Sequence, residues 1–191
     1  MKPLMETLRT VLCLTLLAAA SATAVLAAPA PPPDPAKAAF DSLKTLEGAW
    51  EGVIHTDPPV PDIEGKTTKI WLRVTSMGNV LMHEMKSEGR PDNPITMLYL
   101  DEGRLLLTHY CDAGNRPRMV GTAMPDGKTV DFEYLDVSGP TKYGHMHHAA
   151  FTAVDADHHT EDWTFMLSGD KHVRAHFDLH RVPAPAAAPS K

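Results

Sequence analysis

The chain has 191 residues, only two cysteines and a formal net charge of −6 at pH 7. An acidic chain without a basic stripe lacks the phosphate contacts that dominate nucleic-acid binding, so we expect no nucleic-acid partner. A domain of about 160 residues buries roughly 70% of its unfolded surface, which is enough for a stable core without disulfides.

Residues 1–27 have the composition of a secretory signal peptide, with a basic start, an apolar run and small residues before an expected cleavage after Ala27. The apolar run is shorter than the roughly 20 residues that a membrane-spanning helix needs. We therefore expect an exported protein, periplasmic or secreted, with no stable membrane insertion. Cleavage leaves one cysteine, Cys111, so no internal disulfide is expected.

Residues 28–35 are rich in proline and are expected to form an extended tether. In the next segment, Phe40, Leu43 and Leu46 recur at helical spacing, which predicts a short helix that caps one end of the domain. The domain is expected to cover residues 36–182. The alanine- and proline-rich residues 183–191 have no periodicity and are expected to be a disordered tail.

From Gly48 onward the apolar residues alternate with polar ones, and glycine, proline, aspartate and asparagine mark turns at short, even intervals. This pattern predicts roughly ten strands without intervening helices. Closure removes the exposed edges that an open sheet must protect, so we expect an all-β, antiparallel up-and-down barrel.

Alternation assigns a face of the sheet to each side chain. In residues 104–111 the apolar positions are the odd-numbered ones, so His109 and Cys111 are expected to point into the barrel. The other residues predicted to point inward are Leu81, His83, Met85, Val130, Phe132, Tyr134, Trp163, Phe165, Leu167, Val173, Ala175, Phe177 and Leu179. The opposite face of the last strand is expected to be a solvated stripe of His172, Arg174, His176, Asp178 and His180.

The first and last expected strands carry a pair of residues suited to closing the barrel. Trp50, in the motif Gly48-x-Trp50-x-Gly52, can plug one end, while the guanidinium of Arg181 stacks on the indole and reaches carbonyl groups at the rim. This motif and its distant arginine resemble the calycin superfamily of lipocalins, fatty-acid-binding proteins and nitrobindins.

A second resemblance rests on the segment 108–119 and on the histidine-rich stretch that precedes Trp163. Both are similar to those of a group of secreted bacterial calycin-like proteins of unassigned function, over residues 40–182. The resemblance implies the fold and supplies no reaction.

The first functional hypothesis is a barrel that binds a small apolar or amphipathic ligand in its lumen, since roughly ten strands leave a wider interior than eight. The loop from Asp57 to Gly65 would border the opening. A small molecule is thus the expected partner, and the assembly is expected to be a monomer or a homodimer. The predicted ligand-binding residues are His83, Tyr99, His109, Cys111, Arg118, Tyr134 and Trp163.

The second hypothesis is a metal or haem site. His145 and His147 lie two positions apart on one strand face, as do His109 and Cys111, and these four side chains would suit zinc. Haem is suggested by the resemblance to nitrobindins, which hold haem iron through a histidine on a late strand. The comparable residue is His176, which alternation places outside, so an axial ligand would have to come from His109, His145 or His147. Neither cofactor is favoured over none.

The third hypothesis is a hydrolase. His109 near Cys111 suggests an activated thiol, with Asp112, Asn115 and Arg118 close in sequence as possible orienting groups. The glycine turn at Gly114 explains Asp112 and Asn115 equally well as turn-forming residues.

Overall fold

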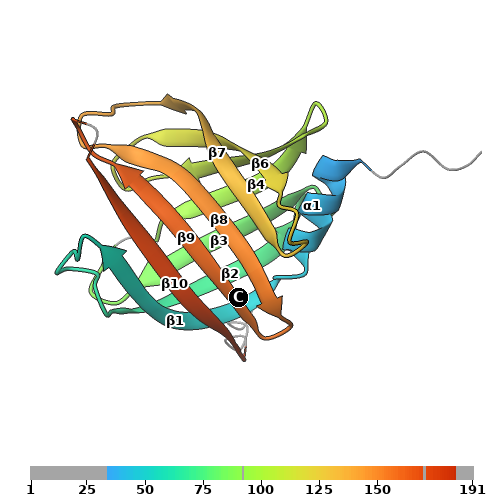
Figure 1. Ribbon diagram of the computed structural model, residues 1–191, viewed down its shortest axis with the longest axis horizontal. Coiled ribbons are helices and arrows are strands. Elements are labelled where there is room, and N and C mark those ends of the chain that lie inside the picture. Colours follow the sequence, from blue (N-terminus) through green and yellow to red (C-terminus); the bar gives the residue numbers. More distant parts are fainter. Residues whose placement is uncertain (1–33, 92, 170, 184–191) are drawn as a thin grey trace, which may run out of the picture. The chain divides into compact units, whose positions relative to one another are not determined.

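The structure is a computed structural model that describes residues 34–91, 93–169 and 171–183. Ten antiparallel strands follow one another along the chain, and the last pairs with the first to close a barrel (Figure 1). The predicted all-β, up-and-down barrel is therefore confirmed. The expected signal peptide, most of the tether and most of the tail lie outside the described residues.

The elements have the following bounds in chain order: α1 Pro35–Lys44, β1 Gly48–Asp57, β2 Thr67–Thr75, η1 Ser76–Gly78, β3 Val80–Ser87, β4 Ile95–Asp101, β5 Arg104–Tyr110, β6 Arg116–Ala123, β7 Thr129–Ser138, β8 His145–Asp155, β9 His158–Met166 and β10 His172–Val182.

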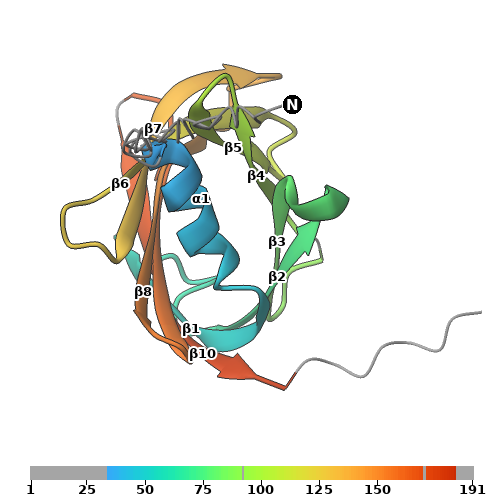
Figure 2. The same ribbon diagram turned by 90° about the vertical axis from the view of Figure 1, so that its right-hand side faces the viewer.

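Asp34 is the N-cap residue of helix α1, and its side chain accepts a hydrogen bond from the backbone N–H of Ala36. Its apolar face buries Ala39, Phe40 and Leu43 in the barrel core. The helix packs against β4, β5 and β6 and lies across one end of the barrel (Figure 2). The short N-terminal helix is thus confirmed. Among the described residues, no helix is long and apolar enough to cross a membrane.

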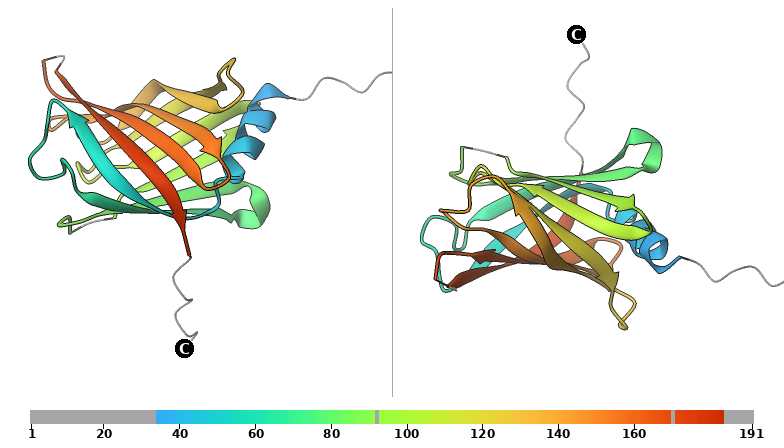
Figure 3. Two further views of the ribbon diagram at one scale, coloured as in Figure 1. Left: turned by 60° about the horizontal axis from the view of Figure 1, so that its bottom comes forward. Right: turned by 90° about the horizontal axis from the view of Figure 1, so that it is seen from above.

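The barrel closes along the seam between β1 and β10, which run side by side over nine residue pairs (Figure 3). A glycine is required on each side of the tryptophan of β1. A Cβ atom on Gly52 would lie 1.8 Å from the backbone oxygen of Asp178, so only a glycine allows the two strands to pair there. A Cβ atom on Gly48, whose φ is +146°, would lie 2.3 Å from Nη1 of Arg181.

Trp50 is fully buried, and its Nε1 donates a hydrogen bond to the backbone oxygen of Leu46 at 2.8 Å. The guanidinium of Arg181 lies over the indole ring, 4.1 Å from its centroid. The same guanidinium donates to the backbone oxygens of Glu47, at 2.7 Å, and Ala156, at 3.0 Å. The contact expected between the tryptophan and the distant arginine is therefore present, and it ties the start of β1 to the end of β10.

Burial follows the predicted alternation along most of the strands, although Leu106, on the face opposite to Leu105 and Leu107, is also fully buried. Leu81, His83, Leu105, Leu107 and His109 are buried, and so are Val130, Phe132, Trp163, Phe177 and Leu179. The expected inward position of Leu167 is wrong, because β9 ends at Met166 and Leu167 lies in the following turn with 41% of its surface exposed. Alternation has no meaning beyond the last residue of a strand.

Candidate functional site

The barrel contains a cavity of about 210 Å³ at the end away from α1. Its lining comes from the last residues of odd-numbered strands, the first residues of even-numbered strands and the loops between them. Helix α1 leads into the first residue of β1 and therefore lies at the other end. Ile63, in the loop that the sequence places at the opening, is part of this lining. The apolar lining residues are Ile54, Ile63, Met85, Pro94, Met146, Trp163, Phe165, Val173, Ala175 and Phe177, and the polar ones are Ser87, Arg90, His109, Cys111 and Asp112.

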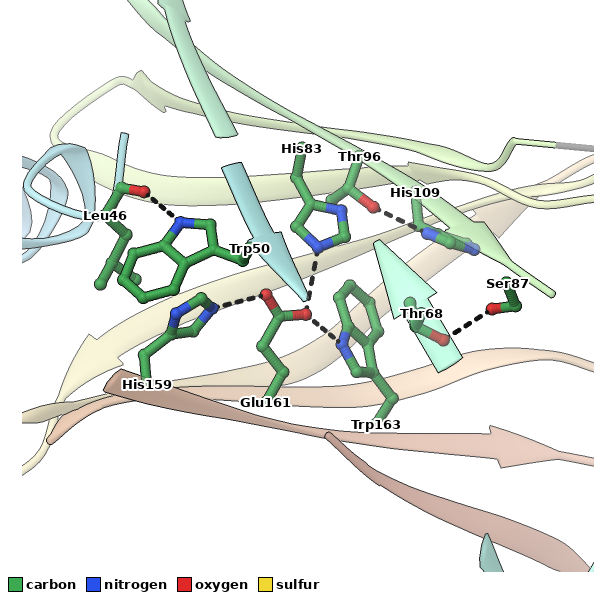
Figure 4. Close-up of polar contacts among 10 residues, drawn as sticks. All are labelled: Leu46, Trp50, Thr68, His83, Ser87, Thr96, His109, His159, Glu161 and Trp163. Atoms are coloured by element: carbon green, nitrogen blue, oxygen red, sulfur yellow. Dashed lines mark hydrogen bonds and ion pairs between the residues drawn. The ribbon is translucent and has the colours of Figure 1, made fainter. Parts of the chain in front are cut away.

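His109 is the most deeply placed polar residue of the cavity wall, with 5% of its surface exposed. Its Nδ1 lies 2.8 Å from the hydroxyl of Thr96, and this contact fixes the ring (Figure 4). Nε2 has no hydrogen-bond partner among the described residues. Burial, reinforced by the charge of His83 and opposed by Asp112, lowers the pKa of His109 from 6.5 to about 4. The imidazole is therefore neutral at pH 7.

The remaining polar residues of the wall lie toward the rim. Arg90 and Asp112 form an ion pair there, and the hydroxyl of Ser87 is 3.0 Å from that of Thr68. The thiol of Cys111 is 3.5 Å from a carboxylate oxygen of Asp112. The charges of Arg90 and Asp112 at the rim thus balance each other and do not form a patch of one sign.

Behind the cavity wall lies a buried carboxylate, Glu161, which accepts three side-chain hydrogen bonds (Figure 4). His83 and His159 each donate through Nε2 at 3.1 Å, one to each oxygen. The indole Nε1 of Trp163 donates at 3.0 Å to the oxygen that His83 also reaches. Glu161 and His159 have no exposed surface, and His83 has 1%.

Opposing effects act on the pKa of Glu161. Burial alone would raise it, but the attraction of His83 and the hydrogen bonds from His159 and His83 outweigh burial and hold it below its usual range. The carboxylate is therefore ionised inside the barrel. Nδ1 of His83 and Nδ1 of His159 are buried, and neither has a hydrogen-bond partner within the part of the chain that the structure describes.

This acid–histidine network links the barrel plug to the cavity. The ring of His159 meets that of Trp50 edge-on, with centroids 4.2 Å apart. At the other side, Trp163 contributes its N–H to the carboxylate and its ring to the cavity wall. The network therefore fixes the orientation of one aromatic wall of the cavity.

Glu161 and His159 were missed in the sequence, although a signal for them exists. They have the same parity as Trp163, which was expected to point inward, so extending the alternation two and four residues toward the N-terminus places both inside the barrel.

The structure brings three of the predicted ligand-binding residues together at the cavity: His109, Cys111 and Trp163. His83 lies one layer behind the wall, with its ring centroid 5.9 Å from that of Trp163.

The other three lie away from the cavity. The hydroxyl of Tyr99 is 3.0 Å from that of Thr108, Arg118 forms a two-bond ion pair with Asp136, and Tyr134 stacks on His147 with centroids 4.5 Å apart.

Asn115, an orienting group in the hydrolase hypothesis, donates its amide protons to the backbone oxygens of Pro140 and Gly144 at 2.8 Å each. These contacts give Asn115 a structural role in the turn.

The predicted metal ligands fall into separate pairs. His145 and His147 contact each other, Nε2 to Nδ1, at 3.2 Å, and neither lines the cavity that His109 and Cys111 border. Among the described residues, none of the four belongs to a group of three or more ligand atoms within 4.8 Å of one another. Two other groups meet that condition: His158 with Asp178 and His180, and His148 with Asp131 and Glu133.

The residues do not fit haem. His176, the residue comparable to the haem ligand of nitrobindins, is bound to Asp162 on the outer wall, Nδ1 to Oδ1, at 2.7 Å. The cavity beside His109 has about 210 Å³, below the roughly 300 Å³ at which pockets for drug-sized ligands begin, and a porphyrin is larger than such ligands.

Comparison with known proteins supports the fold alone. No protein-family model matches the chain, and no curated protein matches it significantly. Among solved structures, the chain is similar to a protein of unknown function from the DUF3598 family of Nostoc punctiforme, with a TM-score of 0.52 and 17% sequence identity. The match covers 73% of this chain and 49% of that protein, so the chain spans about half of its length.

Proposed function

We propose that the protein binds a small, uncharged and mostly apolar organic molecule in the barrel cavity, with His109 as the polar group that orients it. The observation that carries this proposal is a neutral, buried imidazole at the wall of an apolar cavity, with an Nε2 atom that has no partner among the described residues. Ligand sites commonly combine apolar walls with a few placed polar groups in this way.

The volume limits the size of the ligand. About 210 Å³ lies between the roughly 150 Å³ of an engineered cavity that holds benzene and the roughly 300 Å³ at which pockets for drug-sized molecules begin. A monocyclic aromatic compound or a short aliphatic chain fits this range.

The charges limit its chemistry. Arg90 and Asp112 pair with each other at the rim, and the histidine inside is neutral at pH 7, so a charged ligand would lose its hydration without gaining an opposite charge. An alcohol, phenol or amide can instead form one hydrogen bond with Nε2 of His109 while its apolar part packs against Trp163 and Phe177.

The test compares benzene with phenol, two probes that differ by one hydroxyl group, in calorimetric titrations of the full chain. Phenol should bind about five- to tenfold more tightly than benzene, since a buried hydrogen bond contributes about 1–1.5 kcal/mol. In His109→Phe the preference for phenol should disappear. Equal binding of the two probes by the unmodified chain would contradict the assigned role of His109.

A second variant tests the cavity itself. Ala175→Phe places a ring in the cavity and should abolish the binding of both probes, whereas Thr160→Phe, which adds the same ring on the outer face of β9, should leave binding unchanged. Native mass spectrometry of the purified chain would reveal a natural ligand that Ala175→Phe no longer retains.

We also propose that the barrel is calycin-like and acts after export. The closing contact between Trp50 and Arg181 supports the first statement, and the basic and apolar composition of residues 1–27 supports the second. Amino-terminal sequencing of protein recovered from the periplasm or medium tests export, and Ala28 is the expected first residue.

A further inference from the structure

The outer face of the neighbouring strands β9 and β10 carries one histidine from each strand at the same level. In the pairing of β10 with β9, His180 lies directly opposite His158. Their rings stack with centroids 4.5 Å apart and planes inclined by 21°. Cross-strand pairing on a closed sheet therefore holds the two histidines side by side before any ligand arrives.

A carboxylate completes this group. Oδ1 of Asp178 is 2.7 Å from Nε2 of His158 and 3.6 Å from Nε2 of His180. The three ligand atoms lie within 4.8 Å of one another. Both imidazoles thus turn the same nitrogen toward one oxygen.

We propose that His158, Asp178 and His180 form a binding site for a divalent transition-metal ion, of which zinc is the best fit. Two imidazole nitrogens and one carboxylate oxygen are a donor set typical of zinc sites with an open fourth position, which water or a further ligand occupies. Magnesium and calcium prefer oxygen donors throughout, so the pair of imidazoles disfavours them.

The geometry needs only side-chain adjustment. Bonds of about 2.0–2.1 Å in a tetrahedral site place ligand atoms about 3.3 Å apart. The two nitrogens lie 2.7 Å and 3.6 Å from Oδ1 of Asp178, on either side of this value. The side chain of His180 is 65% exposed and that of Asp178 is 54% exposed, so both can rotate without moving the strands. Their exposure also leaves the open position accessible to solvent.

The surroundings favour a cation. Glu51 of β1 lies opposite His180 on its other side, and the chain as a whole carries a net charge of −6. Arg181, which follows His180 in the sequence, is engaged with Trp50 and with Asp157. Glu51 is also 3.3 Å from Lys69, and so its charge is partly balanced already.

The second group, around His148, provides a matched comparison. It has one imidazole and two carboxylates, Asp131 and Glu133, and Nε2 of the histidine is already 2.8 Å from Asp131 and 4.0 Å from Glu133. With one nitrogen donor fewer, it is less suited to zinc.

The test is a calorimetric titration of the chelator-treated full chain with zinc chloride. The unmodified chain should bind one zinc ion tightly, and His180→Ala and Asp178→Asn should each weaken this binding at least about tenfold. His148→Ala and His172→Ala should retain it, the latter being an exposed histidine of the same strand outside the group. Urea unfolding midpoints of all variants establish that each is folded.

A spectroscopic measurement reports the ligands directly. With one equivalent of copper(II) as the probe, electron paramagnetic resonance should show coupling to two imidazole nitrogens in the unmodified chain and to one in His158→Ala. The proposal is overturned if zinc fails to bind, if His148→Ala rather than His180→Ala removes binding, or if copper couples to no nitrogen. Phenol binding in the cavity is independent of these results, because His158 and His180 lie on the outer wall.

Discussion

The buried neutral state of His109 makes a quantitative prediction about stability. The pKa of His109 is about 4 in the folded protein, against an ordinary value of 6.5 that applies when the chain is unfolded. Above pH 6.5 the imidazole is neutral in both states and contributes no pH dependence. Between these two pKa values only the unfolded chain binds the proton, so the free energy of unfolding must decrease as the pH falls.

The size of this effect follows from the shift. A depression of about 2.5 pKa units corresponds to about 3 kcal/mol at about 1.36 kcal/mol per unit, and the nearly complete burial of the ring means that solvent screens little of it. The His109→Gln variant removes the titrating group and keeps a side chain able to hydrogen-bond the hydroxyl of Thr96. Its stability should therefore depend less on pH than that of the unmodified chain.

Urea unfolding at a series of pH values from about 7.5 to about 4 measures this difference. The stability of the unmodified chain, minus that of His109→Gln, should decrease by about 3 kcal/mol over this range. Other titrating groups, including Glu161, contribute to both proteins and cancel in the difference. A difference that stays constant within about 0.5 kcal/mol would refute the buried, neutral state of His109. His172→Gln, at an exposed histidine, serves as the control and should behave like the unmodified chain.

Three further substitutions test the interior and the seam. Glu161→Gln should destabilise the protein by about 3–5 kcal/mol, since it removes the buried carboxylate that accepts hydrogen bonds from His83, His159 and Trp163. The exposed control Glu133→Gln should change stability by less than about 0.5 kcal/mol in urea unfolding. Gly52→Ala should lower the thermal unfolding midpoint or prevent folding, because its Cβ would collide with the backbone of β10; a native-like midpoint would contradict the close approach. Arg181→Ala should lower the free energy of unfolding, measured in urea, by about 1–3 kcal/mol, because the indole contact and the hydrogen bonds to backbone oxygens are lost. An unchanged urea midpoint would show that the stability of the seam does not depend on Arg181.

The strands, their order and the inward faces were predictable because alternation is a local property that burial enforces along every strand. Trp50 and Arg181 were predictable as a pair for a different reason. In an up-and-down barrel the first and last strands must be neighbours, so the two ends of the sequence identify each other. The error at Leu167 arose where the strand ended and this local rule ceased to apply.

The convergence of side chains across the barrel was harder to predict. Alternation places His109 and Trp163 inside, but only the shear of the barrel decides that their ring centroids lie 5.4 Å apart. Arg118 and Tyr99 were expected at the cavity, and each instead has a partner elsewhere. Register depends on turn lengths and on bulges such as the one between Arg118 and Met119. The sequence of a single strand therefore does not determine it.

The difference between alternation within one strand and register between two strands also explains the histidines of the outer wall. His172, His176 and His180 were correctly expected to lie on one outer face, and a single strand gives them no function beyond solvation. Pairing with β9 places His158 opposite His180 and beside Asp178, and three residues from two strands then share one set of ligand atoms. Both proposed sites thus depend on cross-strand register, with His109 and Trp163 inside the wall and His158 and His180 outside it. A one-residue slip of β9 against β10 would exchange the two faces of β9 and abolish both sites at once.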